Sequence, residues 1–393
     1  MTERIYYRDA YAAEFSARVI SRSPDGKRIK LDRSAFYPTS GGQQFDTGVL
    51  NETRVIDVID EEDNIIHLLS APLAADEVIG RLDWPRRYDH MQQHTGQHVL
   101  SAVFEDRFGY GTASVHFGVE SSSIDLETQQ LSREQVLETE ARANAIVQEN
   151  RPVVVSFENA ATALGLRKPP PREGELRVIT IDGVDRSACG GTHVRSTGEV
   201  GPVLLRKQDR MHGNVRIEFL CGGRALKQAR ADYEALARAA AALGTSAGEL
   251  PDRATALQTD LRAAERTRRK LGEELAVFRA NREYRKAQAD ARNVRWIIER
   301  LATGSLDDLR ALAHAATALQ RAAFIGVVLN PPQLLFATSE DTGIDAGKAL
   351  KAALATAGGR GGGSARIAQG TVPPDAIDTA IATLAGGMPP ITG

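Results

Sequence analysis

The amino-acid sequence predicts an α+β protein built from several domains. Its 393 residues are enough for two or three domains at roughly 150 residues each. Apolar residues make up 42% and charged residues 25%, which excludes a disordered chain, a collagen-like fibre and a disulfide scaffold. The apolar pattern also changes along the chain from short alternating runs to helical spacing. The domains that we expect are an N-terminal β-barrel (1–85), an α+β domain (86–223), a helical coiled-coil arm (224–292) and a small α/β C-terminal domain (293–393).

The barrel is predicted from strand-like runs between residues 11 and 81. SARVIS, KRIKLD, TRVIDVID and NIIHLL are short alternating or β-branched segments, and turn residues such as Pro24-Asp25-Gly26 separate them. Short strands with such turns are typical of a small barrel or a curled sheet.

The second domain begins where the apolar residues take up the spacing of one helical face. This spacing predicts a helix over 88–108, and His90, His94 and His98 lie on it. Ser132 and Gln135 are placed as in a capping box, so a second helix begins there. The elements expected around that helix are strands within 113–126, at 153–157 and at 176–181, and a hairpin of 202–205 with 215–220 closed around 211–214.

The third segment is helical from residue 224 and is broken at 244–248. Its apolar residues then follow a heptad, which predicts a two-helix or self-pairing coiled coil. The seam consists of Leu250, Leu257, Leu261, Ala264, Leu271, Leu275 and Phe278. Beyond the arm we expect helices at 306–319 and 345–357, strands at 324–329 and 334–338, and a glycine-rich run at 358–363.

Cysteine usage and hydropathy indicate the compartment. The chain has two cysteines, Cys189 and Cys221, in unlike surroundings, so a structural disulfide is not expected. The longest apolar run, 322–329, is far shorter than the roughly 20 residues that cross a bilayer, and residues 1–9 lack a signal-peptide core. We therefore expect a cytoplasmic protein without a membrane partner.

Two short motifs together predict a metal site. His94-Thr95-Gly96-Gln97-His98 places two imidazoles four residues apart, on one face of a helix. Cys189-Gly190-Gly191-Thr192-His193 adds a thiolate and a third imidazole in a flexible Gly-Gly turn. Three nitrogens and one sulfur form a tetrahedral zinc set. His90 also precedes His94 by four residues, so His90 with His94 is the alternative helical pair.

A stretch of the first domain, RSAFYPTSGGQQFDTG, has the composition of a ligand-binding loop. Gly41 and Gly42 permit a ligand to approach backbone N–H groups closely. Ser34, Thr39 and Gln43 offer hydrogen bonds for a small polar group. A hairpin turn between barrel strands has the same composition, and both interpretations stay open.

Three motifs in this order, FYPTSGGQQFDTG, HTGQH and CGGTHV, resemble the editing domain of alanyl-tRNA synthetase and its free-standing relatives, the AlaX trans-editing proteins. The arm followed by GGRGGGSARIAQG is similar to the synthetase's C-terminal domain, a DHHA1-like tRNA-binding or oligomerisation domain. The resemblance covers nearly the whole chain and points to the long free-standing form. The second domain is accordingly expected to be a zinc-binding editing domain.

This resemblance implies a deacylase that removes serine from the tRNA for alanine, with glycine as a second candidate substrate. Gln43 matches the family's SGGQ glutamine near the reacting ester and is the candidate catalytic residue. Ser34 stands where the family has a threonine associated with sensing the serine hydroxyl. The Zn²⁺ ligands implied by the resemblance are His94, His98, Cys189 and His193.

The expected macromolecular partner is tRNA. Residues 224–300 carry 17 Lys and Arg against 11 Asp and Glu, a charge suited to a phosphate backbone. A solvated coiled-coil surface is the alternative interpretation, and the heptads also suit a homodimer. The residues that we expect at the RNA are Arg268, Arg269, Lys270, Gly359, Arg360 and Gly361.

Other functions share parts of this pattern. Editing of threonyl-tRNA uses a similar HxxxH and CxxxH set, and a non-catalytic tRNA-binding protein with structural zinc would keep all four ligands. Metalloprotease chemistry is disfavoured because Thr95 stands where HExxH has its glutamate. A DHH phosphoesterase is disfavoured because Asp89-His90-Met91 departs from DHH.

Overall fold

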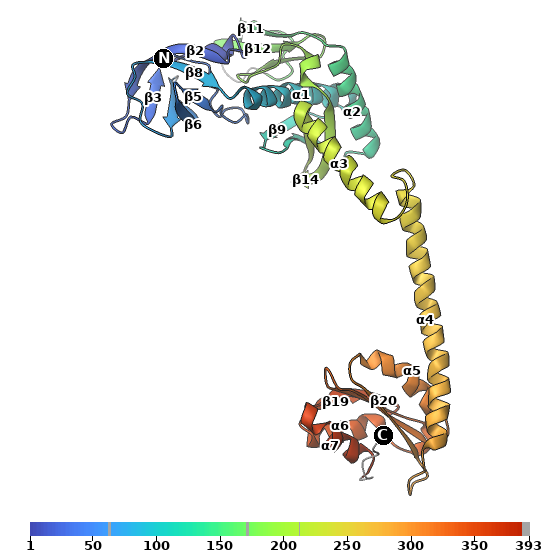
Figure 1. Ribbon diagram of the computed structural model, residues 1–393. Helices are drawn as coiled ribbons and strands as arrows, with labels where there is room; N and C mark the ends of the chain where they lie inside the picture. The colour runs from blue at the N-terminus through green and yellow to red at the C-terminus, as the bar shows by residue number, and fades with distance from the viewer. Residues whose placement is uncertain (62–63, 170–172, 212, 387–393) are drawn as a thin grey trace. The chain divides into compact units, whose positions relative to one another are not determined.

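The structure is a computed structural model that describes residues 1–61, 64–169, 173–211 and 213–386. The chain divides into two compact units, Met1–Ala239 and Ala240–Gly393 (Figure 1). A closed barrel, open sheets and seven α-helices in the described ranges confirm the α+β class. The predicted hairpin turn includes position 212, and the expected domains include positions 62–63, 170–172 and 387–393, all of which lie outside these ranges.

The first unit opens with a closed barrel of six antiparallel strands, as the alternating runs predict. Ile29, Leu31 and Leu50 are fully buried inside it, because alternate residues of each strand face the interior. The strands follow one another around the barrel in the order β2 (Glu14–Arg22), β3 (Arg28–Leu31), β7 (Asn64–Leu69), β6 (Thr53–Glu61), β5 (Gly48–Leu50) and β8 (Glu77–Leu82). A short β1 (Glu3–Arg4) pairs with β4 (Arg33–Ser34).

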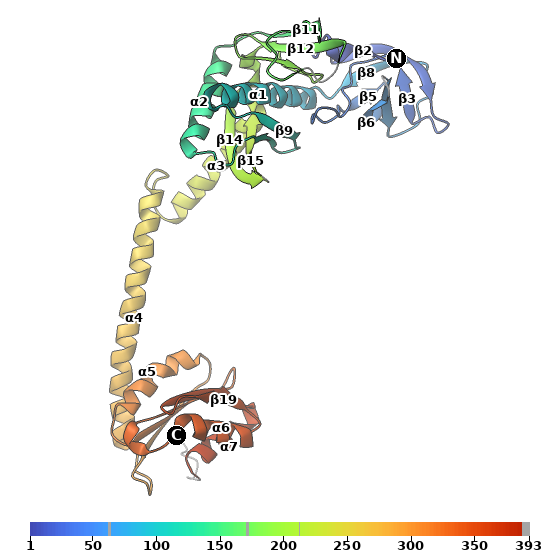
Figure 2. The ribbon, with the colours of Figure 1, turned by 180° about the vertical axis from the view of Figure 1, so that it is seen from behind.

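Helix α1 (Trp84–Phe108) leads from the barrel into the rest of the first unit. It begins four residues before the predicted start, because Asp83 caps the N–H of Arg86 and a proline occupies the first turn. Gly109 ends the helix in a left-handed conformation. Figures 1 and 2 both show α1 between two sheets, which accounts for the burial of most of its length.

The two sheets beside α1 are antiparallel. One has the order β14 (Val203–Met211), β15 (Asn214–Cys221), β10 (Ser122–Leu126) and β9 (Thr112–Phe117), and the other has β11 (Val153–Asn159), β12 (Glu175–Ile181) and β13 (Asp185–Ala188). Helix α2 (Arg133–Gln148) has the predicted capping box. The strand predicted at 202–205 was too short, because β14 continues to Met211 past a bulge after Leu205 that interrupts its alternation. Strand β13 was not expected.

The second unit is a five-stranded sheet with helices on both faces. The sheet order is β16 (Arg295–Leu301), β17 (Ala322–Val328), β18 (Gln333–Thr338), β20 (Ile367–Thr371) and β19 (Arg360–Gly363). One core joins the sheet to the end of α4 (Leu250–Lys286) and to α5 (Leu306–Thr317), and another joins it to α6 (Ala346–Thr356) and α7 (Ile377–Leu384). Most of the glycine-rich run at 358–363 forms the edge strand β19.

The predicted helices on either side of residues 244–248 are α3 (Gly222–Ala242) and α4. The heptad seam of α4 is not buried, since Leu261 and Phe278 are 61% and 68% exposed. The buried residues of α4 are instead Ala276 and Ala280, which pack in the core beside α5. Coiled-coil pairing of α4 stays a prediction.

Within the described ranges, no helix combines the length and the apolar character that a membrane span requires.

Candidate metal centre

Four side chains predicted as metal ligands come together in the first unit. His94 and His98 lie one turn apart on α1, while Cys189 and His193 lie in the turn that follows β13. One ligand atom from each residue lies within 4.8 Å of the others. The Cys189 Sγ is 3.4 Å from the Nε2 atoms of both His94 and His193. Tetrahedral zinc with ordinary bond lengths places sulfur and nitrogen ligands about 3.5 Å apart, so the group fits this ion.

The close approach of the two motifs depends on Gly191. A Cβ atom there would lie 2.1 Å from Cε1 of His94, which no real side chain tolerates. Arg177 holds the same turn from outside, donating to the carbonyl oxygens of Cys189 at 2.7 Å and Gly191 at 2.9 Å. Gly191 therefore lets the turn approach the helix closely enough to bring its two predicted ligands to those of α1.

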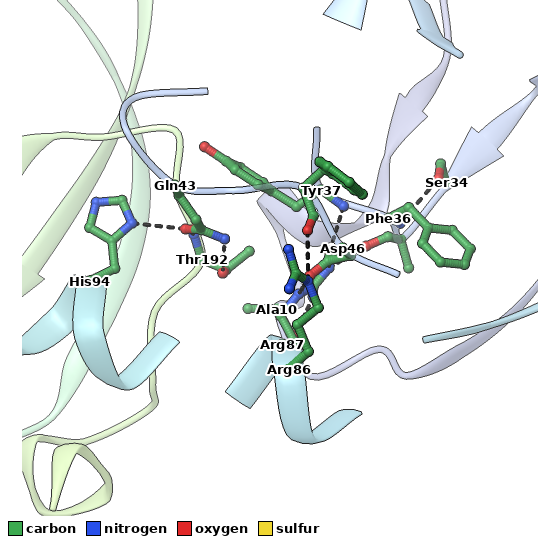
Figure 3. A network of polar contacts seen from close by, with 12 residues as sticks. Ala10, Ser34, Phe36, Tyr37, Gln43, Asp46, Arg86, Arg87, His94 and Thr192 are labelled. Carbon is green, nitrogen blue, oxygen red and sulfur yellow. Dashed lines mark hydrogen bonds and ion pairs between the residues drawn. The ribbon is translucent and has the colours of Figure 1, made fainter. Parts of the chain in front are cut away.

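All three histidines have a partner at Nδ1, which leaves each Nε2 free for a metal. His94 Nδ1 lies 2.9 Å from Oε1 of Gln43 (Figure 3). His98 Nδ1 lies 2.7 Å from Oδ2 of Asp185, and His193 Nδ1 lies 3.1 Å from the Thr95 hydroxyl. Outer partners of this kind orient metal-bound imidazoles and set their tautomer.

Asp185 is the charged member of these three partners. Its side chain is fully buried and also accepts hydrogen bonds from Arg167 Nε at 2.7 Å and Ser187 Oγ at 3.0 Å. Burial opposes the charge on both partners, but their mutual hydrogen bond and neighbouring groups outweigh it. Asp185 together with the Cys189 sulfur raises the pKa of His98 to about 9, and His98 together with Arg167 lowers the pKa of Asp185 to about 2. The sequence analysis missed this residue, because the short strand β13 that carries it was not expected.

The thiol of Cys189 ionises more readily than that of an ordinary cysteine. Burial alone opposes its ionisation, but the imidazoles of His94 and His193 hold its pKa well below the usual range. The other cysteine, Cys221, is fully buried, and burial raises the pKa of its thiol. The surroundings of the two thiols therefore shift their pKa values in opposite directions.

His90 lies outside the four-residue group. It is 6% exposed, its Nδ1 has no hydrogen-bond partner among the described residues, and burial lowers its pKa to about 4. Of the two helical pairs left open by the sequence, the structure brings His94 and His98 to the other ligands.

The residues predicted in the SGGQ loop differ in burial and in their distance from the metal group. Gln43 is 1% exposed and touches the metal group through His94. Gly41 and Gly42 are exposed with φ of 55° and 83°, so the turn needs glycine. Thr39 is exposed, and its hydroxyl accepts from the Phe45 N–H.

Ser34 is not brought to the metal group. Its side chain is fully buried and its oxygen lies 2.8 Å from Nε2 of His67, while also accepting from the Phe36 N–H. Figure 3 places Ser34 on the side of the Arg87–Asp46 pair away from His94.

A buried ion pair that the sequence analysis missed anchors this loop to α1. Arg87 is fully buried and donates from Nε to both carboxylate oxygens of Asp46, at 3.1 and 3.0 Å (Figure 3). Asp46 in turn accepts from the backbone N–H of Tyr37 at 2.6 Å, and Arg87 also donates to the carbonyl of Ala10. The pair holds both ends of the 37–46 segment against the helix.

The residues predicted at the RNA lie in the second unit. Arg268, Arg269 and Lys270 are exposed on α4, and Lys270 is 3.9 Å from Glu274. Gly359 precedes the edge strand β19, which begins with the exposed residues Arg360 and Gly361. Nothing in their surroundings distinguishes them from a solvated surface.

Fold and site together define a class of protein: a two-unit α+β chain in which a buried group of three histidines and one cysteine, suited to zinc, lies beside a glycine-containing barrel loop. Family models agree with this class. The Threonyl and Alanyl tRNA synthetase second additional domain matches residues 176–218, and the DHHA1 domain matches 293–386.

Two similar proteins identify the family within this class. The alanyl-tRNA editing protein AlaX-M of Methanosarcina acetivorans is 36% identical over 56% of this chain and 98% of its own length. Alanyl-tRNA editing protein Aarsd1-B of Xenopus laevis is 31% identical over 72% of this chain and 73% of its own length. The chain therefore belongs to the alanyl-tRNA editing protein family.

Longer relatives cover more of this chain. The alanine–tRNA ligase of Pyrococcus abyssi is 34% identical over 94% of it, but the chain spans only 42% of that ligase's length. A solved structure, the C-Ala domain of Aquifex aeolicus alanyl-tRNA synthetase, covers 24% of the chain at 18% identity with a TM-score of 0.21.

Proposed function

We propose that the protein is a trans-editing deacylase that hydrolyses the ester joining wrongly attached serine to the tRNA for alanine. Glycine on the same tRNA is the second candidate substrate. The observation that carries the proposal is the buried His94, His98, Cys189 and His193 group in contact with the SGGQ loop. Membership of a family whose relatives are named alanyl-tRNA editing proteins supports it.

The proposed chemistry divides between the loop and the metal group. An aminoacyl ester is already reactive, so positioning it against an oriented water supplies much of the acceleration. Zn²⁺ held by the four ligands would supply a Lewis acid or a fixed contact for the end of the substrate. Under this proposal the exposed residues Thr39, Gly41 and Gly42 bind the aminoacyl group. A pocket that hydrogen-bonds the serine hydroxyl would reject alanine, because its own polar groups would be left unpaired.

The remaining parts are assigned by the same proposal. The four segments 1–85, 86–223, 224–292 and 293–393 are the barrel, the editing domain, the arm and the tRNA-binding or oligomerisation domain. Arg268, Arg269, Lys270 and the 359–361 segment contact the tRNA backbone. The exposed seam of α4 is the proposed homodimer contact, and the proposed location is the cytoplasm.

A second candidate function is a non-catalytic tRNA-binding protein with structural zinc. The observation that favours it is the ligand count, because four protein ligands complete a tetrahedral shell and structural zinc sites are closed in this way. Editing of threonyl-tRNA is the other alternative, since the matched domain is named for both synthetases.

A deacylation assay separates these functions. The tRNA for alanine is charged separately with serine, glycine and alanine and incubated with zinc-loaded wild type, Cys189→Ala and Cys221→Ala. We expect rapid loss of serine over alanine, unchanged by Cys221→Ala. Cys189→Ala should reduce zinc affinity by more than the roughly 10- to 100-fold that changing an outer partner costs, and should abolish the activity.

Cys221→Ala is a matched control because it removes the only other thiol of the chain. If zinc-loaded wild type deacylates none of the three substrates, the editing proposal fails and the structural-zinc alternative replaces it. If serine on the tRNA for threonine is released faster than serine on the tRNA for alanine, the threonyl assignment replaces it.

A further inference from the structure

Gln43 uses both ends of its carboxamide inside the protein. Its Oε1 lies 2.9 Å from Nδ1 of His94 and accepts from the backbone N–H of Thr192 at 3.1 Å. Its Nε2 donates to the hydroxyl of Thr192 at 2.9 Å (Figure 3). The side chain therefore joins three separate segments: the barrel loop, α1 and the turn between Cys189 and His193.

The backbone contact decides which way the amide faces. The Thr192 N–H can only donate, so the atom of Gln43 next to it must be the oxygen. That same oxygen faces His94 Nδ1, so Nδ1 must carry the proton and donate. The lone pair of His94 is then on Nε2, the atom that lies 3.4 Å from Cys189 Sγ.

The other two histidines obtain their Nδ1 partners from elsewhere. His193 is held by Thr95 of α1, and His98 is held by Asp185 of β13. Of the three partners, Gln43 is the one that comes from the loop proposed to bind the aminoacyl group. Its carboxamide is also 1% exposed, so the surrounding protein covers it.

We propose that Gln43 is a positioning residue, which acts through His94 by fixing its tautomer and tying the substrate loop to the metal ligands, and does not itself react with the ester. The role in the reaction rests on the proposed editing function. The role toward the metal does not, because it concerns the orientation of one ligand. Outer partners of metal-bound histidines typically change metal affinity by about 10- to 100-fold when they are removed.

Three variants test the proposal: Gln43→Ala, Gln43→Glu and the neighbouring, partly exposed Gln44→Ala as a matched control. Gln43→Ala removes the acceptor, so zinc affinity measured against a competing chelator should fall about 10- to 100-fold. Gln43→Glu keeps an oxygen that can accept from both His94 and Thr192. It should therefore bind zinc within about threefold of wild type, with the absorption spectrum of the cobalt-substituted protein unchanged.

Activity at saturating zinc provides the second measurement. We expect Gln43→Glu to retain deacylation and Gln44→Ala to match wild type throughout. If Gln43→Ala and Gln43→Glu both bind zinc like wild type but lose deacylation, Gln43 acts on the ester through its N–H group and the proposal is overturned. If wild type lacks deacylation, the editing function fails, while the zinc affinities still decide whether Gln43 positions His94.

Discussion

Helices α1 and α4 differ in how much of their length is buried. Of the 25 residues of α1, 15 are buried, and they include Arg87, Gln97 and Ser101 beside the histidines. Of the 37 residues of α4, only Ala276 and Ala280 are buried, although leucines recur along its seam. Burial therefore depends on what packs around a helix and not on its own apolar residues alone. Helix α1 lies between two sheets, whereas only the end of α4 packs against a core.

Most buried polar side chains of α1 are tolerable because they are paired; the exception among the described residues is His90, whose Nδ1 has no hydrogen-bond partner. Gln93 exchanges two hydrogen bonds with the backbone of Cys221, and Gln97 donates to Ser101 at 2.8 Å. An unpaired buried polar group would cost about 1–3 kcal/mol. The apolar seam of α4 raises a different problem: its leucines are exposed to water in a row, which favours association with another surface.

The largest effect on the buried polar residues of α1 is expected from removing Arg87, the cation of the buried Arg87–Asp46 pair. Arg87→Met should lower the free energy of unfolding of the first unit by about 3–5 kcal/mol, because the Asp46 carboxylate is left buried without its partner. The chain has two tryptophans, Trp84 in the first unit and Trp296 in the second. Urea unfolding followed by Trp84 fluorescence in a Trp296→Phe background therefore reports on the first unit.

Arg86→Met is the control for this measurement. Arg86 is the neighbouring arginine, is partly exposed and donates to the carbonyl of Phe45 at 3.0 Å, so its loss should cost no more than about 1 kcal/mol. Adding Asp46→Asn to Arg87→Met should recover part of the stability. Equal effects of Arg86→Met and Arg87→Met would mean that the buried pair contributes nothing beyond packing.

Local spacing predicts only parts of the candidate metal group. It places His94 and His98 on one helical face and Cys189 and His193 in one short turn, but it allows His90 with His94 equally well, and only the resemblance chose between the two helical pairs. The hydrogen-bond partners of these histidines were not predictable, because they depend on segments far apart in sequence meeting in space. Gln43 lies 51 positions from His94, and Asp185 lies 87 positions from His98. Ser34 shows the same limit, since no local pattern reveals that His67, 33 residues away, occupies its hydroxyl.

The barrel offers a test of a buried polar group by pH. His67 is fully buried, and burial lowers its pKa to about 4, against an ordinary value of 6.5. In this window the unfolded chain binds the proton more readily than the folded chain. The free energy of unfolding should therefore fall by about 3 kcal/mol from this residue as the pH drops from 6.5 to 4.

His67→Gln isolates that contribution, because an amide can still donate to the carbonyl of Ile29 and accept from Ser34 but does not titrate. Unfolding free energies of both proteins are compared between pH 6.5 and pH 4. We expect a shallower decline in the variant. If the unfolding free energies of wild type and variant declined in parallel, protonation of His67 would not destabilise the folded barrel.

The smallest effect is expected on the seam of α4, where two adjacent residues face opposite surroundings. Leu275 is 56% exposed, whereas Ala276 is 6% exposed in the core beside α5. Leu275→Gln should change the unfolding free energy of the second unit, followed by Trp296 in a Trp84→Phe background, by no more than about 0.5 kcal/mol. Ala276→Gln should cost about 1–3 kcal/mol, because the larger side chain overpacks the core.

Protein concentration then shows whether the seam has a partner. In a dimer formed through α4, Leu275→Gln combined with Leu271→Gln would halve the mass measured by light scattering and would destabilise the second unit only at concentrations where wild type is dimeric. Loss of stability at every concentration would place Leu275 in a core within the chain. The seam of α4 would then be part of a core and not an exposed surface, and the difference in burial between α1 and α4 would be smaller.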